Sequence, residues 1–194
     1  DPSMYDLGNF VLEQALWDSK LFLQQNPDFF INVNVSAKQL ERPDFCRVVL
    51  ELLDKTEFPV RHLCLEITER CRSLPVSVIN ERMAVLRGYG IKFAMDDFGT
   101  GSSSSAMALE MLIDEIKIDM SFIRKILVNK KNKAIVQSMV DFANAANIKS
   151  CLEGVENKAL EDYLRTVGAT WFQGYYYSKP VGADELEILL SAKK

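Results

Sequence analysis

The sequence has few of the residues from which thiolate metal centres and disulfide frameworks are built. It contains one histidine among 194 residues. Its four cysteines, Cys46, Cys64, Cys71 and Cys151, form no Cys-x-x-Cys pair. This spacing argues against a zinc site and against a disulfide framework. We therefore expect reduced thiols and a cytoplasmic location.

The chain also lacks an excess of positive charge and long apolar runs. The chain carries 23 Lys and Arg against 27 Asp and Glu, a formal net charge of −4. General binding of duplex nucleic acid requires a basic face that neutralises phosphates, so we expect no duplex partner. The apolar runs are too short to span a bilayer, and the first residues lack the basic and apolar regions of a signal peptide. We expect neither a membrane span nor a signal peptide within these residues.

Apolar residues recur along the chain with two different periods. They make up 48% of a chain whose charged share is 26%, which is typical of one globular domain, here residues 1–194. Helical spacing predicts helices over about 7–25 and 183–190, and within 45–53, 135–146 and 159–167. Runs rich in β-branched and aromatic residues predict strands at 29–35, 62–67, 91–96, 115–119, 148–153 and 170–175. This alternation predicts a parallel α/β fold.

Each predicted strand has one polar face. In the first strand Asn32 and Asn34 alternate with apolar residues, and the later strands follow a similar rule. An open sheet with helices on both faces would instead contain nearly continuous apolar runs. The alternation therefore favours a (β/α)8 barrel of the TIM type with polar side chains turned inward. Six strands do not complete eight, so either two strands precede Asp1 or the sheet stays open.

The last inward residue of every predicted strand is polar or charged. These residues are Asn34, Glu66, Asp96, Lys117, Glu153 and Gln173. Active sites of parallel barrels form at the carboxyl ends of the strands, so the six side chains are expected to meet at one mouth. Scattered surface carboxylates are the alternative for any single position. Six equivalent positions in succession favour a shared site.

Six sequence strings at these strand ends resemble the EAL family of bacterial cyclic di-GMP phosphodiesterases. They are INVNVSAKQL (31–40), LEITE (65–69), DDFGTG (96–101), KID (117–119), EGVE (153–156) and QGYYYSKP (173–180). The strings occur in family order and span nearly the whole chain. The resemblance implies a modified (β/α)8 barrel of the EAL type, here lacking its first two strands.

The resemblance also implies roles for individual residues. Asn34, Glu66 and Asp96 would hold one divalent metal ion, and Asp97 would hold the second. Lys117 would hold the attacking water, Glu153 would be a general base or metal contact, and Gln173 would orient water or metal. Three further positions match the family's loop and substrate-side residues, namely Glu69, which would anchor the loop after Asp97, Thr100 within that loop, and Glu156.

The implied cofactors are two Mg²⁺ or Mn²⁺ ions per site. Such ions take carboxylate and amide oxygens as ligands, neutralise phosphoryl oxygens and activate water. The scarcity of histidine and of paired cysteines favours these hard cations over zinc. The implied partners are cyclic di-GMP, a second copy of the chain in a homodimer, and upstream sensor or GGDEF domains that would tether it in the bacterial cytoplasm.

The chain departs from the family in one respect that matters for activity. Nothing in it matches the Glu-Ala-Leu motif, which supplies a metal-ligand glutamate and a nearby arginine. Two hypotheses follow: hydrolysis of cyclic di-GMP to linear pGpG, or a catalytically impaired receptor or dimerising regulatory module. A third is an unrelated carboxylate-rich barrel enzyme. Schiff-base chemistry at Lys117 is disfavoured, because neighbouring carboxylates keep an ammonium charged.

Overall fold

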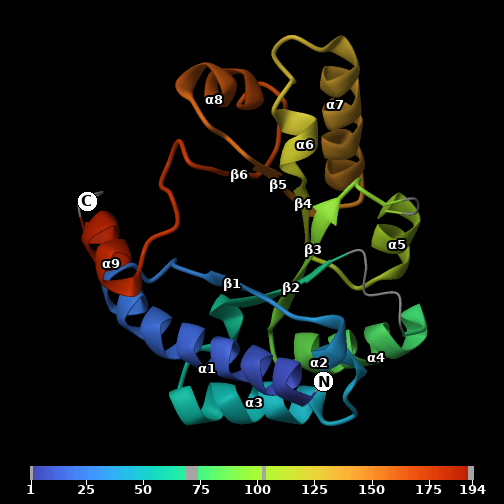
Figure 1. Ribbon diagram of the computed structural model, residues 1–194. Coiled ribbons are helices and arrows are strands. Elements are labelled where there is room, and N and C mark those ends of the chain that lie inside the picture. The colour runs from blue at the N-terminus through green and yellow to red at the C-terminus, as the bar shows by residue number, and fades with distance from the viewer. Residues whose placement is uncertain (1, 69–73, 102–103, 192–194) are drawn as a thin grey trace. The chain divides into compact units, whose positions relative to one another are not determined.

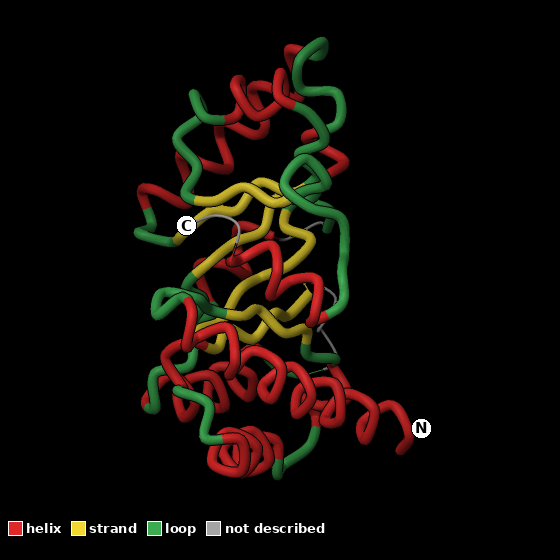
Figure 2. The backbone as a smooth tube through the Cα atoms, turned by 90° about the vertical axis from the view of Figure 1, so that its left-hand side faces the viewer, coloured by secondary structure: helices red, strands yellow, loops and turns green. Residues whose placement is uncertain are grey.

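The computed structural model describes residues 2–68, 74–101 and 104–191. Across these ranges six strands alternate with helices (Figures 1 and 2). The strands are β1 (Ile31–Asn34), β2 (Leu63–Thr68), β3 (Lys92–Phe98), β4 (Glu115–Ile118), β5 (Lys149–Glu153) and β6 (Trp171–Gln173). Their hydrogen-bonded order is the order of the chain, β1-β2-β3-β4-β5-β6. The predicted parallel α/β fold is confirmed for the strand pairs β1–β2, β3–β4, β4–β5 and β5–β6.

Helices follow the strands along the chain. They are α1 (Pro2–Gln25), α2 (Ala37–Glu41), α3 (Phe45–Thr56), α4 (Val76–Gly88), α5 (Ser104–Glu110), α6 (Met120–Ile123), α7 (Lys130–Ala145), α8 (Lys158–Leu164) and α9 (Ala183–Ser191), with a 3-10 turn η1 (Val60–His62) before β2. Within the described ranges, no helix combines the length and the apolar character needed to cross a membrane.

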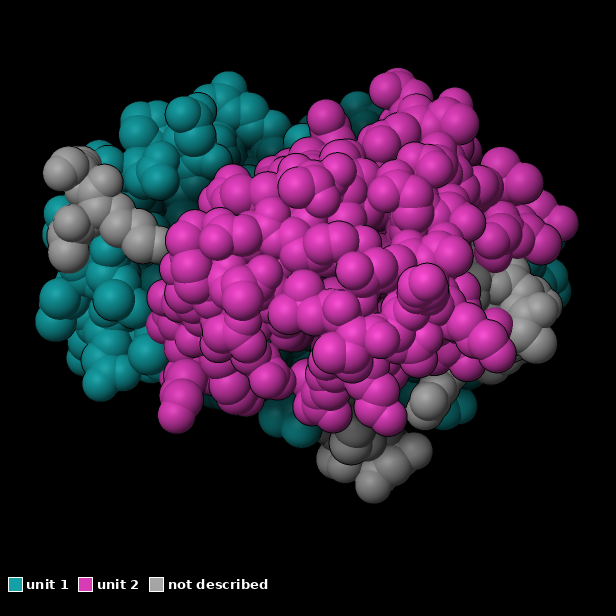
Figure 3. Space-filling model, turned by 90° about the horizontal axis from the view of Figure 1, so that it is seen from above, with its two compact units in different colours: residues 1–93, 181–194 teal, residues 94–180 magenta. Residues whose placement is uncertain are grey.

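The chain forms two compact units, one of residues 1–93 and 181–194 and one of residues 94–180 (Figure 3). In the first unit, α1 packs against α3. Leu12 and Leu16 of α1 and Val49 and Leu53 of α3 are at most 3% exposed. A spacing of four residues puts each pair on one face of its helix, which is why the amphipathic pattern of residues 45–53 predicts α3.

The core of the second unit lies between its strands and α7. Ile116 and Ile118 of β4 and Leu152 of β5 are fully buried, as are Val136 and Val140 of α7. The register of β4 on β5 places Ile116 opposite Ser150 and Ile118 opposite Leu152. The apolar face predicted for β4 is thus the one covered by core residues, and its polar face carries Lys117.

Each of the six predicted strands differs from the observed strand by one or two residues at one or both ends. Two of these differences have clear local causes. β6 ends at Gln173 rather than at residue 175, because the chain turns at Gly174. β3 continues to Phe98 rather than ending at Asp96, because the strand contains a bulge at its end.

Candidate active site

The end of β3 carries two consecutive carboxylates because the strand is irregular there. Met95 pairs with Ile116 and Phe98 pairs with Ile118, so both Asp96 and Asp97 stand against the single residue between them on β4. Such an extra residue is a β-bulge, which redirects side chains that would otherwise alternate between faces. The aspartates can therefore share one end of the strand.

Asp97 adopts a backbone conformation that supports this bulge. Its φ is +55°, in the left-handed region that aspartate tolerates better than most residues. Its carbonyl oxygen accepts hydrogen bonds from Thr100, at 3.2 Å from the backbone nitrogen and 2.9 Å from Oγ1. Thr100, predicted as a loop residue, thus closes the turn that follows the two aspartates.

Lys117 lies between two of the predicted carboxylates. Its side chain is 6% exposed, and its Nζ is 2.9 Å from Glu153 Oε1 and 3.3 Å from Asp96 Oδ1. A buried ammonium is costly unless it is paired, and two carboxylates favour its charged form. The pairing brings together residues from β3, β4 and β5, as the strand-end pattern predicts. It also argues against a neutral, nucleophilic lysine here.

Glu153 and Gln173 stand opposite each other at the ends of β5 and β6. Beyond them, two chain segments are joined through Val155: its backbone nitrogen donates to the Gln173 oxygen at 3.0 Å, and its oxygen accepts from Tyr176 at 2.9 Å. A Cβ at Gly174 would overlap backbone atoms of Val155. Only glycine lets the turn after β6 approach the segment after β5 this closely.

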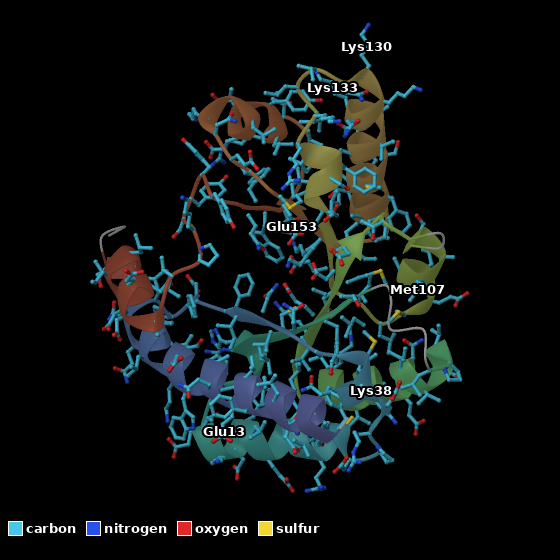
Figure 4. All side chains as sticks on the ribbon, viewed as in Figure 1. Glu13, Lys38, Met107, Lys130, Lys133 and Glu153 are labelled. Atoms are coloured by element: carbon cyan, nitrogen blue, oxygen red, sulfur yellow. The ribbon has the colours of Figure 1, made fainter. Side chains whose placement is uncertain are left out.

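A pocket of about 400 Å³ opens beside these strand ends. It is lined by Met120, Arg124, Glu153, Gly154, Glu156, Gln173, Gly174 and Tyr175. Glu153, which is labelled in Figure 4, links the pocket to Lys117. The volume falls within the usual range of small-molecule sites. The pocket thus contains three predicted site residues, Glu153, Glu156 and Gln173.

Sequence reasoning missed Arg124, which brings positive charge to this pocket. Its Nη2 is 3.7 Å from Met120 Sδ, one helical turn earlier. Met120 and Arg124 both line the pocket, because residues four apart share one side of a helix. The signal available in the sequence was an arginine shortly after the KID string (117–119).

The first unit holds two more of the predicted metal ligands. Asn34 is exposed at the end of β1 and is the register partner of Glu66 on β2, which is 4% exposed. Asn32 Nδ2 donates to Glu66 Oε1 at 2.9 Å, while the Asn32 Oδ1 atom is buried and has no hydrogen-bond partner among the described residues. Sequence reasoning placed Asn32 on the polar face but gave it no role.

The donor set suits a hard cation. The available groups are carboxylate and amide oxygens, and a buried amide oxygen without a partner is an atom that a cation or its water would satisfy. Among the described residues, no group of three or more His, Cys, Asp or Glu side chains has the geometry of a metal centre. That Asn34, Glu66, Asp96 and Asp97 act together as ligands stays a prediction. Glu69 lies outside the described residues.

Comparison with known proteins connects this geometry to one family. The family model described as EAL domain matches residues 3–180. The cyclic di-GMP phosphodiesterase PdeA of Borreliella burgdorferi is 31% identical over 175 residues, which are 90% of this chain and 26% of PdeA. The chain spans about a quarter of the length of the first curated relatives it matches.

Solved structures agree over nearly the whole chain. The PaMucR phosphodiesterase, solved as a c-di-GMP complex, has a TM-score of 0.89 at 30% identity, covering 95% of this chain and 75% of that one. BlrP1 of Klebsiella pneumoniae, solved as a manganese and cyclic di-GMP complex, has a TM-score of 0.81 at 25% identity, covering 91% of this chain and 45% of that one. The predicted fold class, an α/β barrel of the EAL type, is confirmed by this likeness.

Proposed function

Because the chain belongs to the EAL domain family, we propose that it hydrolyses cyclic di-GMP to linear pGpG with the help of two divalent cations. The observation that carries this proposal is the buried Lys117, held by Asp96 and Glu153 beside a pocket that Glu153 and Gln173 also line. A substrate phosphate in this pocket would lie near the charged groups that the reaction requires.

In this proposal Asn34, Glu66 and Asp96 hold one Mg²⁺ or Mn²⁺ ion, and Asp97 holds the other. When bound, such ions neutralise charge on the phosphoryl oxygens and make a water more acidic. The bulge at the end of β3 supports the assignment, since it allows Asp97 to serve beside Asp96 instead of pointing to the opposite face. The manganese complex of BlrP1 is consistent with this choice of metal.

Lys117 and Glu153 divide the handling of the attacking water between them. Lys117 Nζ is held in place by two carboxylates, so it can donate a hydrogen bond to the water from a constant position. Glu153 touches both Lys117 and the pocket, and as a carboxylate it can accept the water's proton. Gln173, its cross-strand neighbour, orients the water through its amide.

The proposal is tested by measuring cyclic di-GMP binding and turnover with Mn²⁺ or Mg²⁺. The variant Glu153→Gln keeps the size of the side chain and removes the base, so turnover should fall by at least about a hundredfold while binding remains. Asp162→Asn, an exposed change on α8, is the matched control and should leave both unchanged. Metal-dependent binding without turnover in the unaltered chain would contradict hydrolysis and favour a receptor.

We further propose that the chain works as a homodimer and, in the bacterial cytoplasm, beside upstream sensor or GGDEF domains. The length of its relatives, of which the chain spans about a quarter, supports the neighbouring domains. The homodimer rests on the family resemblance alone. Sedimentation of the purified chain with and without cyclic di-GMP tests the dimer. A monomer under both conditions would contradict it.

A further inference from the structure

We propose that Tyr177 and Glu161 are positioning residues that hold one wall of the pocket from behind. The wall is the turn of residues 174–177, and the anchor is the Glu161 carboxylate on α8. The Tyr177 hydroxyl joins the two, because it donates a hydrogen bond to Glu161 Oε1 at 3.3 Å. Neither residue lines the pocket, whereas Gly174 and Tyr175 of the same turn do.

Glu161 is a well-fixed anchor. Its side chain is 6% exposed, and Oε1 accepts hydrogen bonds from Arg165 Nη2 at 2.6 Å and Nε at 3.0 Å. Oε2 accepts from Lys158 Nζ at 3.2 Å. The Arg165 hydrogen bond is the main reason that the pKa of Glu161 lies below its ordinary value. The anchor is therefore an ionised carboxylate held by the first residue of α8 and by the C-cap residue that follows the helix.

Tyr177 is suited to act as the connecting donor. Burial, followed by the negative charge of Glu161, raises the pKa of the Tyr177 phenol above its ordinary value. The hydroxyl thus keeps its proton throughout the neutral range and can donate it to the carboxylate. A hydrogen bond that ends on an ionised acceptor is stronger than one between neutral groups.

The turn of residues 174–177 is hydrogen-bonded to the backbone of the opposite pocket wall. Tyr176 donates its backbone hydrogen to the Val155 oxygen at 2.9 Å, and Tyr177 donates to the Gly174 oxygen at 3.1 Å. Val155 lies between Gly154 and Glu156, both of which line the pocket. A turn released at Tyr177 would loosen these backbone bonds and widen the pocket.

Arg165, the C-cap residue of α8, connects this helix to the strand before the turn. Its guanidinium carbon lies 5.5 Å from the ring centre of Phe172 in β6. The segment 172–177 is thus held at both ends by α8, through Phe172 at its start and Tyr177 at its end. An arginine over an aromatic face adds a modest attraction at an exposed position.

The test uses Tyr177→Phe in the full chain, with Tyr163→Phe as the matched control. Both changes remove one hydroxyl, but Tyr163 is on α8 and reaches the turn through no hydrogen bond that the structure gives. We expect amide hydrogen exchange within 174–178 to accelerate about fivefold in Tyr177→Phe, the effect of one lost hydrogen bond of ordinary strength. Exchange within α8, and everywhere in Tyr163→Phe, should stay as in the unaltered chain.

A binding measurement extends the test to the pocket and rests on the proposed function. With cyclic di-GMP and Mn²⁺, Tyr177→Phe should raise Kd and KM about threefold to tenfold and change kcat less than twofold, because the residue touches no reacting atom. Glu161→Gln is the second variant, and it should accelerate exchange in both α8 and the turn.

The outcomes separate the two proposals. Unchanged exchange in residues 174–178 of Tyr177→Phe would overturn the positioning role whether or not the chain binds nucleotide. Faster exchange with a fall in kcat and no change in KM would also overturn it, because the turn would then act on chemistry rather than on the pocket wall. Failure of the unaltered chain to bind cyclic di-GMP would count against the proposed function alone.

Discussion

Two clusters in the second unit each hold a buried charged side chain among groups of opposite charge. The buried charge is positive in one cluster and negative in the other. In the Lys117 cluster, a cation lies between the carboxylates of Asp96 and Glu153. In the Glu161 cluster, a carboxylate lies between Lys158 and Arg165 and also accepts a hydrogen bond from the Tyr177 hydroxyl. The central side chain is 6% exposed in both clusters. Each buried charge is thus matched by more than one opposite charge or donor, as burial requires.

The clusters differ in where their partners come from. Both charged partners of Glu161 lie three or four residues away: Lys158 is the first residue of α8 and Arg165 is its C-cap residue, so the cluster forms as soon as α8 forms. The partners of Lys117 lie on β3 and β5 and meet it only when the strands pair. A local cluster supports an element, whereas a cluster assembled from three strands at the mouth of a pocket is the arrangement from which reactive sites are made.

Among the variants that test this difference between the clusters, the one that removes the Lys117 charge should lose the most stability. Lys117→Met leaves two carboxylates, each less than a fifth exposed, without the cation between them. We expect a loss of about 3 kcal/mol in the free energy of unfolding, measured by urea denaturation, because an uncompensated buried charge is strongly destabilising. Turnover of cyclic di-GMP should be lost as well.

Lys38→Met is the control for this loss, because Lys38 is 63% exposed and pairs with Glu41 on the surface. Its effect should be within about 0.5 kcal/mol. The double variant Lys117→Met with Glu153→Gln should recover part of the stability, since one of the two repelling charges is gone. Equal stability of Lys117→Met and Lys38→Met would contradict the view that the buried cluster is electrostatically coupled.

Gly174→Ala should have the next largest effect, and it acts on the turn that carries Tyr177. The added methyl group would overlap Val155 backbone atoms, which cannot move aside as a flexible side chain can. We expect a cost of about 1 to 3 kcal/mol and weaker nucleotide binding. Gly88→Ala is the control of opposite sign: a Cβ there meets nothing within 4 Å and the residue lies in α4, so stability should rise slightly.

How far the sequence predicts the site depends on how regular the local structure is. The period of two in β4 and β5 is enough to place Lys117 and Glu153 on one face, and the structure brings them to 2.9 Å. The same rule sends Asp97 to the opposite face from Asp96. Only the bulge makes both aspartates available, and a bulge leaves no periodic signal in one sequence.

Contacts between distant segments are the part that periodicity cannot supply. The spacing of Glu161 and Arg165 predicts their ion pair, but the separation of 16 residues between Glu161 and Tyr177 carries no such information. α4 is a different case, because its buried residues Ile79, Met83 and Leu86 have helical spacing that the sequence offers. That helix was within reach of the prediction, whereas the Tyr177 contact was not.

The smallest effect should be the change in stability with pH that comes from Glu161. The direction of this change tests whether the Glu161 carboxylate is stabilised by its partners. The pKa of Glu161 is lowered in the folded chain, chiefly by the Arg165 hydrogen bond. Its contribution is therefore fully present above the unfolded glutamate pKa of about 4.3 and is lost as the pH falls below that value through the lowered folded pKa. Between pH 7 and pH 5 the melting temperatures of the unaltered chain and of Glu161→Gln should differ by a constant amount. Below about pH 4.3 that difference should shrink, because the unaltered chain then loses the same ion pairs.

The measurement is a series of thermal melts in buffers of constant ionic strength, with Asp162→Asn on the exposed side of α8 as the control. If the difference in melting temperature widened as the pH fell, the Glu161 carboxylate would not be stabilised by Lys158 and Arg165. The two clusters would then not be equivalent arrangements of opposite charge.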